Sequence, residues 1–246
     1  MAGNNPERQR STGGARAGSH WAALLAFSLV IGTQPASAQR RDPDNPTCPP
    51  NLNVSTYPEM RFTLLERPDE APVLLAEGGI DESMMPRLEA ALAGFEGREI
   101  WLRSPGGYDD LGIEAAGLIR RRGLSTRIPA DWSCLGGCSF MFLGGTSRSV
   151  DAGGQFVVQM FTTVDDPAAV TDLGEVAATA AMVATADYDF MIRMGVSPRL
   201  LGDIVYRQSA RPTADNRATR RCLTADELRE YRVVTAETAE VPGRDE

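Results

Sequence analysis

Serine and cysteine side chains that could act as nucleophiles lie close together in one short segment, Ser133–Ser139 (SCLGGCS). Ser133 precedes a Gly136–Gly137 pair, and Cys138 and Ser139 follow it on a predicted short helix. A serine or cysteine attacks a carbonyl carbon efficiently only when a neighbouring base takes its proton. The first chemistry to consider is therefore acyl transfer, with this segment supplying the nucleophile.

The usual bases for that chemistry are absent from the part of the chain that we expect to fold. The only histidine is His20, which lies in a predicted signal peptide, and all 25 basic residues are arginine. This composition excludes Ser-His-Asp, Cys-His and Ser-Lys catalysis. It also removes the commonest zinc ligand, so we predict no metal and no cofactor.

Carboxylates are the remaining bases. Asp109, Asp110 and Glu114 follow the turn Ser104–Gly107 (SPGG). Burial can raise the pKa of a carboxylate far enough for it to work as a base near neutral pH. The alternative is that these acids are ordinary charges on a helix surface, and we favour that interpretation.

Glycines mark the places where the chain could hold a negatively charged oxygen. Gly106 and Gly107 follow a predicted strand, and Gly137 begins a predicted helix. Backbone N–H groups from two such places can converge into an oxyanion hole. The glycines could instead do no more than allow a strand and a helix to pack closely.

Four cysteines allow three disulfide connectivities, and the alternatives are a metal site and reduced thiols. Cys134 and Cys138 have a weak metal spacing without a supporting histidine. A strand end and the first turn of the next helix can bring two Cα atoms within about 6–7 Å. We therefore predict the disulfides Cys134–Cys138 and Cys48–Cys222, the second of which would tie a Pro-rich lead-in to the last helix.

Hydrophobic periodicity predicts the elements that would position these residues. Strands are predicted at 60–66, 72–75, 99–103, 124–129 and 155–161, and helices at about 85–95, 109–122, 136–143, 173–194, 198–206 and 224–231. Strands that alternate with helices indicate an α/β fold with a parallel sheet. The chain shows no internal repeat, so we predict one domain.

The N-terminal 38 residues have the order of a secretory signal peptide. Arg8, Arg10 and Arg16 are followed by an apolar run of 12 residues, Trp21–Gly32, and by the small residues Ala36–Ala38. Because a spanning helix needs about 20 apolar residues, we favour cleavage after Ala38 over a membrane anchor. This order predicts a periplasmic or secreted protein with no membrane span after cleavage.

The predicted organisation has four parts: a signal peptide (1–38), an extended Pro-rich lead-in (39–57), one domain (58–236) and a flexible tail (237–246). The formal net charge of the whole chain is −8. An acidic chain is a poor match for a polyanion, so we predict no nucleic-acid partner.

Several motifs occur in an order that is known from one protein family. They are Val73–Leu75 with Gly78–Ile80, Trp101–Gly107 with Gly112, Cys134–Ser139 with Gly144–Gly145 and Arg148, Phe156–Gln159, and Leu223–Leu228. Together they resemble the catalytic-subunit family of Clp protease (ClpP) and its crotonase-fold relatives, over about residues 61–234. The resemblance implies an α/β fold of the ClpP/crotonase type, in which ββα repeats build a parallel sheet with flanking helices in a single domain.

The resemblance also implies that the catalytic residues of the family are missing. The nucleophilic serine falls on Gly136, the histidine on Gln159, and the aspartate on or near Arg220. Glycine has no side chain that could attack, and glutamine cannot accept a proton near neutral pH. The family's oxyanion-hole positions correspond to Gly106, Gly107 and Gly137. Members assemble through the helix that follows the Gln159 strand, which implies a homo-oligomer.

The sequence therefore favours an exported, noncatalytic pseudoprotease that serves as a binding or assembly module for an unidentified peptide or protein. The alternative is a serine- or cysteine-type peptidase or esterase with a relocated nucleophile, Ser139 or Cys138, and a carboxylate base. A purely structural exported domain is the least specific interpretation.

Overall fold

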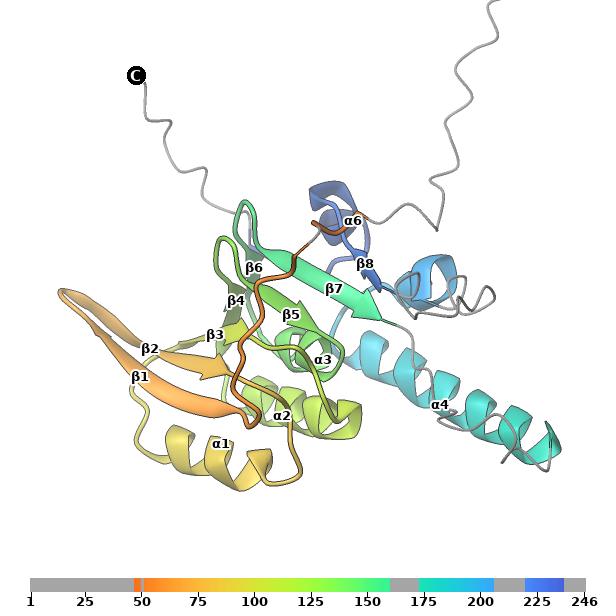
Figure 1. Ribbon diagram of the computed structural model, residues 1–246, viewed down its shortest axis with the longest axis horizontal. Coiled ribbons are helices and arrows are strands. Elements are labelled where there is room, and N and C mark those ends of the chain that lie inside the picture. Colours follow the sequence, from red (N-terminus) through yellow and green to blue (C-terminus); the bar gives the residue numbers. More distant parts are fainter. Residues whose placement is uncertain (1–46, 50, 160–172, 206–219, 237–246) are drawn as a thin grey trace, which may run out of the picture. The chain divides into compact units, whose positions relative to one another are not determined.

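Parallel strands form the centre of the larger sheet. The computed structural model describes residues 47–49, 51–159, 173–205 and 220–236, all within the compact unit Arg41–Glu246 (Figure 1). The sheet has the order β1 (Arg61–Arg67), β2 (Glu70–Glu77), β3 (Glu99–Arg103), β4 (Ser125–Ile128) and β6 (Arg148–Val150). β1 runs antiparallel to β2, and the other neighbours are parallel.

Two helices cover one face of this sheet, α1 (Met84–Ala93) and α2 (Asp109–Arg121) (Figure 1). Side chains alternate across a strand, so Ile100 and Leu102 of β3 point into the core and are fully buried. Trp101, between them, is half-buried on the opposite face. Because buried and half-buried side chains alternate along β3, only the face with Ile100 and Leu102 packs against the helices.

A smaller sheet continues from the end of β3. It has the order β5 (Ser133–Leu135), β7 (Gln155–Gln159) and β8 (Arg220–Cys222), with β5 parallel to β7 and β8 antiparallel to it. A bridge between Ser104 and Cys134 joins the two sheets. The segments that the sequence marks for chemistry, Ser104–Gly107 and Ser133–Ser139, therefore begin side by side.

The short apolar helix α3 (Gly137–Leu143) packs against α2 backbone to backbone. A Cβ atom on Gly112 of α2 would overlap the backbone of Gly137. At the other end of α3, a Cβ atom on Gly144 would lie 2.5 Å from the Cα atom of Ala116. Only very small residues allow two helices to approach so closely, which explains the glycines at these positions.

Arg148, 2% exposed, connects the C-terminal part of the domain to the core. Its guanidinium donates to the carbonyl oxygens of Val233 (2.7 Å), Arg232 (2.8 Å) and Met194 (3.0 Å). Burial, with a smaller contribution from the charge of Arg120, lowers the pKa of Arg148 to about 10. These bonds connect β6 to the end of α4 (Leu173–Arg193) and to the segment after α6 (Ala225–Glu230).

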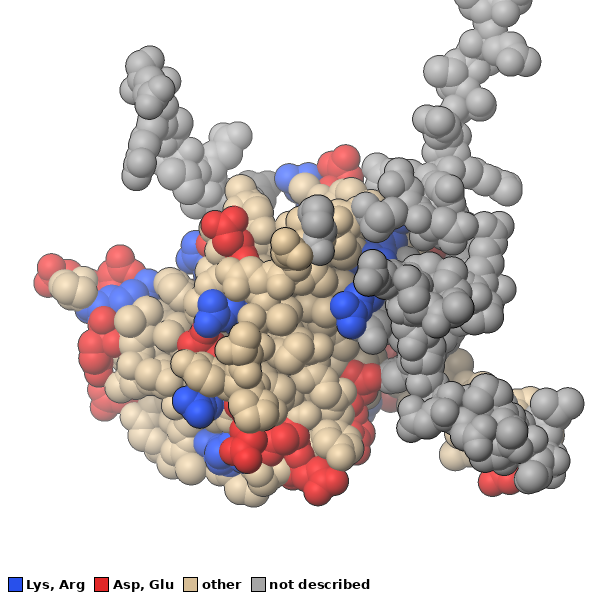
Figure 2. Space-filling view, in the orientation of Figure 1, with Lys and Arg blue, Asp and Glu red and all other residues tan. Residues whose placement is uncertain are grey.

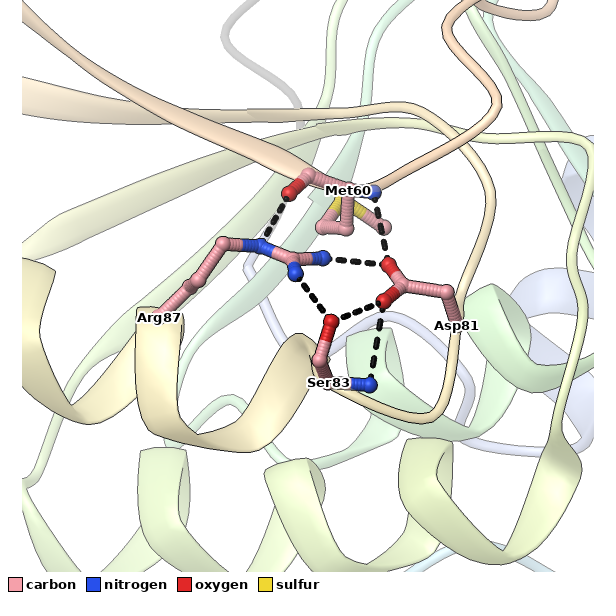
Figure 3. A network of polar contacts seen from close by, with 4 residues as sticks. All are labelled: Met60, Asp81, Ser83 and Arg87. Atoms are coloured by element: carbon pink, nitrogen blue, oxygen red, sulfur yellow. Dashed lines mark hydrogen bonds and ion pairs between the residues drawn. The ribbon is translucent and has the colours of Figure 1, made fainter.

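A polar network holds the residue before β1, Met60, at the start of α1 (Figure 3). Asp81 accepts hydrogen bonds from the Met60 N–H (3.1 Å) and the Ser83 hydroxyl (2.8 Å), and it pairs with Arg87. Burial opposes ionisation of Asp81, but these hydrogen bonds outweigh it and lower its pKa to about 2. The network therefore holds the start of β1 on α1 as long as Asp81 is ionised.

The structure confirms the predicted α/β class, with a parallel sheet and flanking helices. It differs in detail: β5, β6 and β8 were not predicted, β1 is shifted by one residue, β2 is longer than predicted, and the helix predicted at 198–206 is π-helical over Leu201–Val205. The predicted signal peptide (1–38) and tail (237–246) and part of the lead-in lie outside the described residues.

Replacing Arg148 by Met tests the role of the buried guanidinium. Because Arg148→Met leaves several buried carbonyl groups without a donor, we expect the free energy of unfolding to fall by roughly 3 kcal/mol or more. The matched control is Arg127→Met, since Arg127 pairs with Asp151 (2.8 Å) nearer the surface, where a pair contributes less than about 1 kcal/mol. Urea unfolding measures both, and equal losses would contradict the prediction.

Candidate functional site

Gly136 forms the turn between β5 and α3, where the resemblance places a nucleophile. Its φ of +52° and ψ of −126° are unfavourable for residues with a side chain. A Cβ atom built on Gly136 would lie 3.5 Å from Oδ1 of Asp109 and 3.8 Å from the Cα atom of Gly106. The backbone conformation explains the glycine, and the nearest polar side-chain atom is a carboxylate oxygen.

The Ser104–Gly107 turn lies against Gly136 on one side and Ile80 on the other. The Gly106 N–H donates to the Ser104 hydroxyl (3.1 Å), and the Gly106 carbonyl accepts from the Ile80 N–H (2.8 Å). Gly107 has a φ of +141°, and a Cβ there would overlap the Ile80 carbonyl. The Gly107 N–H has no hydrogen-bond partner among the described residues, whereas the Gly106 N–H is already used.

Gly137 completes the group of predicted oxyanion residues. A Cβ on Gly137 would lie 2.7 Å from the Tyr108 carbonyl oxygen and 3.0 Å from Cδ1 of Ile80. Gly106, Gly107 and Gly137 therefore gather around Ile80 and Gly136. Close packing accounts for all three glycines, and their use as anion-binding donors stays a prediction.

The two residues predicted as alternative nucleophiles, Ser139 and Cys138, here called the reserve nucleophiles, both have other partners. The Ser139 hydroxyl, 7% exposed, lies 2.7 Å from the Val157 carbonyl oxygen and 3.2 Å from that of Cys134, to which it donates. Cys138 is fully buried and bonded to Cys134. Neither side chain contacts a carboxylate within the described ranges.

Both disulfides join the cysteines that the sequence analysis paired. Cys134–Cys138 has a Cα–Cα distance of 5.3 Å and closes the Gly136 turn. Cys48–Cys222 has a Cα–Cα distance of 4.8 Å and links the lead-in to β8, just before α6. The part of the chain that the structure describes contains no free cysteine.

Asp109, which the sequence analysis favoured as a surface charge, is partly buried at the start of α2. Its Oδ1 atom is inaccessible to solvent and has no hydrogen-bond partner among the described residues. Burial raises the pKa of Asp109 to about 7, and the charges of Asp187 and Asp110 add to this effect. Asp110 and Glu114 are exposed, as expected for helix surface charges.

The positions predicted for the lost histidine and aspartate lie on neighbouring strands. Gln159 of β7 and Arg220 of β8 are opposite each other in the antiparallel register. Val157, two residues before Gln159, contacts Ser139 of α3 and pairs with Leu135. The end of β7 therefore lies beside the start of α3, and a single site that includes Gln159 and Gly136 stays a prediction.

The described residues hold no group of His, Cys, Asp and Glu side chains that could bind a metal ion. None of the described helices is long and apolar enough to cross a membrane. The predictions of no metal and no cofactor stay predictions.

Comparisons with known proteins identify a similarity of structure only. No protein-family model matches the chain, and no curated protein matches it by sequence. Among solved structures, the chain is similar to a mutant of ClpP1 from Listeria monocytogenes, with 15% sequence identity and a TM-score of 0.38. The match covers 66% of this chain and 88% of that chain. Similarity at this level says nothing about activity.

Replacing Asp109 by Asn tests the burial of its carboxyl group. Because the folded-state pKa is raised from 3.8 to about 7, the unfolded chain ionises first, and stability is lost as the pH rises through this window. We expect Asp109→Asn to be more stable than wild type by roughly 1–3 kcal/mol at pH 8 and about equally stable at pH 4.

Urea unfolding between pH 4 and pH 8 measures this difference. The matched control is Asp110→Asn, which removes an exposed neighbouring charge and should keep the pH dependence of wild type. If Asp109→Asn keeps that dependence as well, the carboxyl group of Asp109 is not the group that titrates.

Proposed function

We propose that this chain is an exported, noncatalytic domain with a ClpP-like scaffold that acts as a binding or assembly module. The observation that carries the proposal is that both reserve nucleophiles have other partners. The Ser139 hydroxyl donates to backbone carbonyls, and the Cys138 sulfur is in a disulfide. With glycine at position 136, the turn between β5 and α3 offers no side chain for covalent catalysis.

The state of these two side chains opposes nucleophilic attack. A disulfide sulfur cannot form the thiolate that cysteine chemistry requires. A serine hydroxyl that donates its only hydrogen to a carbonyl has no base to receive that proton, because a carbonyl oxygen is far too weakly basic. Both observations support a pseudoprotease and count against the alternative, a serine- or cysteine-type peptidase or esterase.

One observation favours that alternative. The pKa of Asp109, about 7, suits a general base, and its Oδ1 atom lies near Gly136. A relocated hydrolase would need Ser139 or Cys138 to leave its present partner and approach this carboxylate. No described hydroxyl or thiol donates to Asp109, so we rank the hydrolase second.

Export is the second part of the proposal. Two disulfides in one domain are typical of proteins from an oxidising compartment. The basic, apolar and small-residue order of residues 8–38 supports cleavage after Ala38 and a periplasmic or secreted location.

The proposed partner is a second copy of this chain, which docks on α4. Large apolar side chains are exposed on this helix: Met182 is 73% exposed, Ile192 63% and Val183 41%. A contiguous patch of exposed apolar side chains commonly marks an interaction surface. Nucleic acid is not part of the proposal, because charges of both signs are scattered over the face in Figure 2 and several arginines pair with acids.

Reaction with a fluorophosphonate serine-hydrolase probe tests the noncatalytic assignment. We expect no labelling of the wild type and ester hydrolysis at no more than about 10³–10⁴-fold over the uncatalysed rate, the level that remains when a catalytic triad is lost. An active serine peptidase serves as the positive control. Robust wild-type labelling that disappears in Ser139→Ala would overturn the assignment and promote the hydrolase.

Substitution on α4 tests the assembly surface. We expect wild type to form an oligomer and the double variant Met182→Glu, Ile192→Glu to be a monomer, because burying these charges between copies is costly. Light scattering coupled to size-exclusion chromatography measures both masses. The control is Leu64→Glu on β1, also at a half-exposed position, which should leave the assembly intact. A monomeric wild type, or an equal effect of Leu64→Glu, would contradict the proposed surface.

A further inference from the structure

The lead-in crosses the smaller sheet, and its first half is held there by few contacts. Residues 47–49 and 51–55, here called the strap, make one backbone hydrogen bond to the sheet, from the Ser133 N–H to the Asn53 carbonyl oxygen (2.9 Å). The Thr47 hydroxyl donates to the Cys222 carbonyl oxygen (2.5 Å). The Cys48–Cys222 disulfide is the covalent link at this end.

Apolar side chains of the strap pack on a small hydrophobic cluster in the smaller sheet. Leu52 and Val54, with Cys48, pack on Leu135, Val157 and Cys222, which are 3%, 0% and 1% exposed. This cluster is separate from the main core of the domain. Removal of the strap would therefore uncover the face of β5, β7 and β8 without opening the main core.

The residues between the strap and β1 have anchors of their own. The Tyr57 carbonyl oxygen accepts from the Gly79 N–H (3.0 Å), and the Asp81 network fixes Met60 (Figure 3). These contacts do not depend on a disulfide. Release of the strap would therefore leave the anchors of Tyr57 and Met60 in place.

The two disulfides differ in their access to solvent. Cys134 and Cys138 are both fully buried, whereas Cys48 is partly exposed and only its partner Cys222 is buried. Thiol–disulfide exchange begins when a thiolate reaches a disulfide sulfur, so access determines which bond reacts first. The disulfide with a partly exposed cysteine is the one that holds the strap.

We propose that the strap is a redox latch: reduction of Cys48–Cys222 releases it and uncovers Leu135 and Val157, while the rest of the domain stays folded. A thiolate of a dithiol attacks the Cys48 sulfur, and the Cys222 sulfur leaves as a thiolate that takes up a proton. The second thiol of the dithiol then resolves the mixed disulfide. The dithiol is oxidised by two electrons, and Cys48 and Cys222 become thiols. This inference goes beyond the proposed function and does not depend on it.

Partial reduction of the purified, disulfide-bonded protein by dithiothreitol tests the proposal. Alkylation followed by mass spectrometry should find Cys48 and Cys222 modified first, while Cys134 and Cys138 stay bonded. In the same sample, hydrogen exchange of the Ser133 amide should become faster by about tenfold or more, because this amide loses its acceptor on the strap. The Gln155 amide, which donates to Trp132, and the Gly79 amide should exchange as before.

Two double variants separate the latch from a general loss of stability. Cys48→Ser with Cys222→Ser should show the fast Ser133 exchange without reductant and no further change with it. Cys134→Ser with Cys138→Ser should keep a slow Ser133 exchange until reductant is added. The proposal would be overturned if Cys134–Cys138 were reduced before Cys48–Cys222. It would also be overturned if the exchange rate of the Ser133 amide did not change after reduction of Cys48–Cys222, or if the exchange rates of the Gln155 and Gly79 amides rose with it. Because the reduction experiment uses wild type, it decides the question even if a variant does not fold.

Discussion

The close contact between α2 and α3 is the constraint on which the candidate site depends. At both ends of α3 a small residue on one helix touches the backbone of the other, Gly112 on Gly137 and Gly144 on Ala116. With no side chain in between, neither helix can shift without a collision, since interiors are packed as densely as crystals. This contact fixes Asp109 beside Gly136, because Asp109 begins α2 and Gly136 directly precedes α3.

The turn between β5 and α3 is shaped mainly by interactions that constrain the backbone. Its glycines, disulfide and hydrogen bonds to main-chain carbonyls all act to hold the backbone in place. The partly buried carboxyl group of Asp109 is the exception, since its ionisation costs stability and it has no hydrogen-bond partner among the described residues to offset that cost.

The sequence alone was sufficient to predict the elements in which the pattern of apolar residues is clear. The strand predicted at 99–103 coincides with β3, and the helix predicted at 109–122 nearly coincides with α2. Strands of three residues, such as β5, β6 and β8, are too short to show an alternation, and their pairing is decided by contacts distant in sequence. The burial of Asp109 could not be predicted for a related reason. An acid in the first turn of a helix is normally exposed, and Asp187, whose like charge helps to raise the pKa of Asp109, belongs to α4, far along the chain.

The link between Cys48 and Cys222 also has a consequence for the order in which the domain is assembled. The two residues are separated by 174 positions, so the bond can form only after almost the whole folded part of the chain has been synthesised. Strand β8 pairs with β7 from a similarly late position, whereas β1, β2 and β3 are neighbours along the chain. Contacts between distant residues form slowly, because a long loop must first be closed. The smaller sheet can therefore be completed only when β8 is available, whereas β1, β2 and β3 can pair earlier.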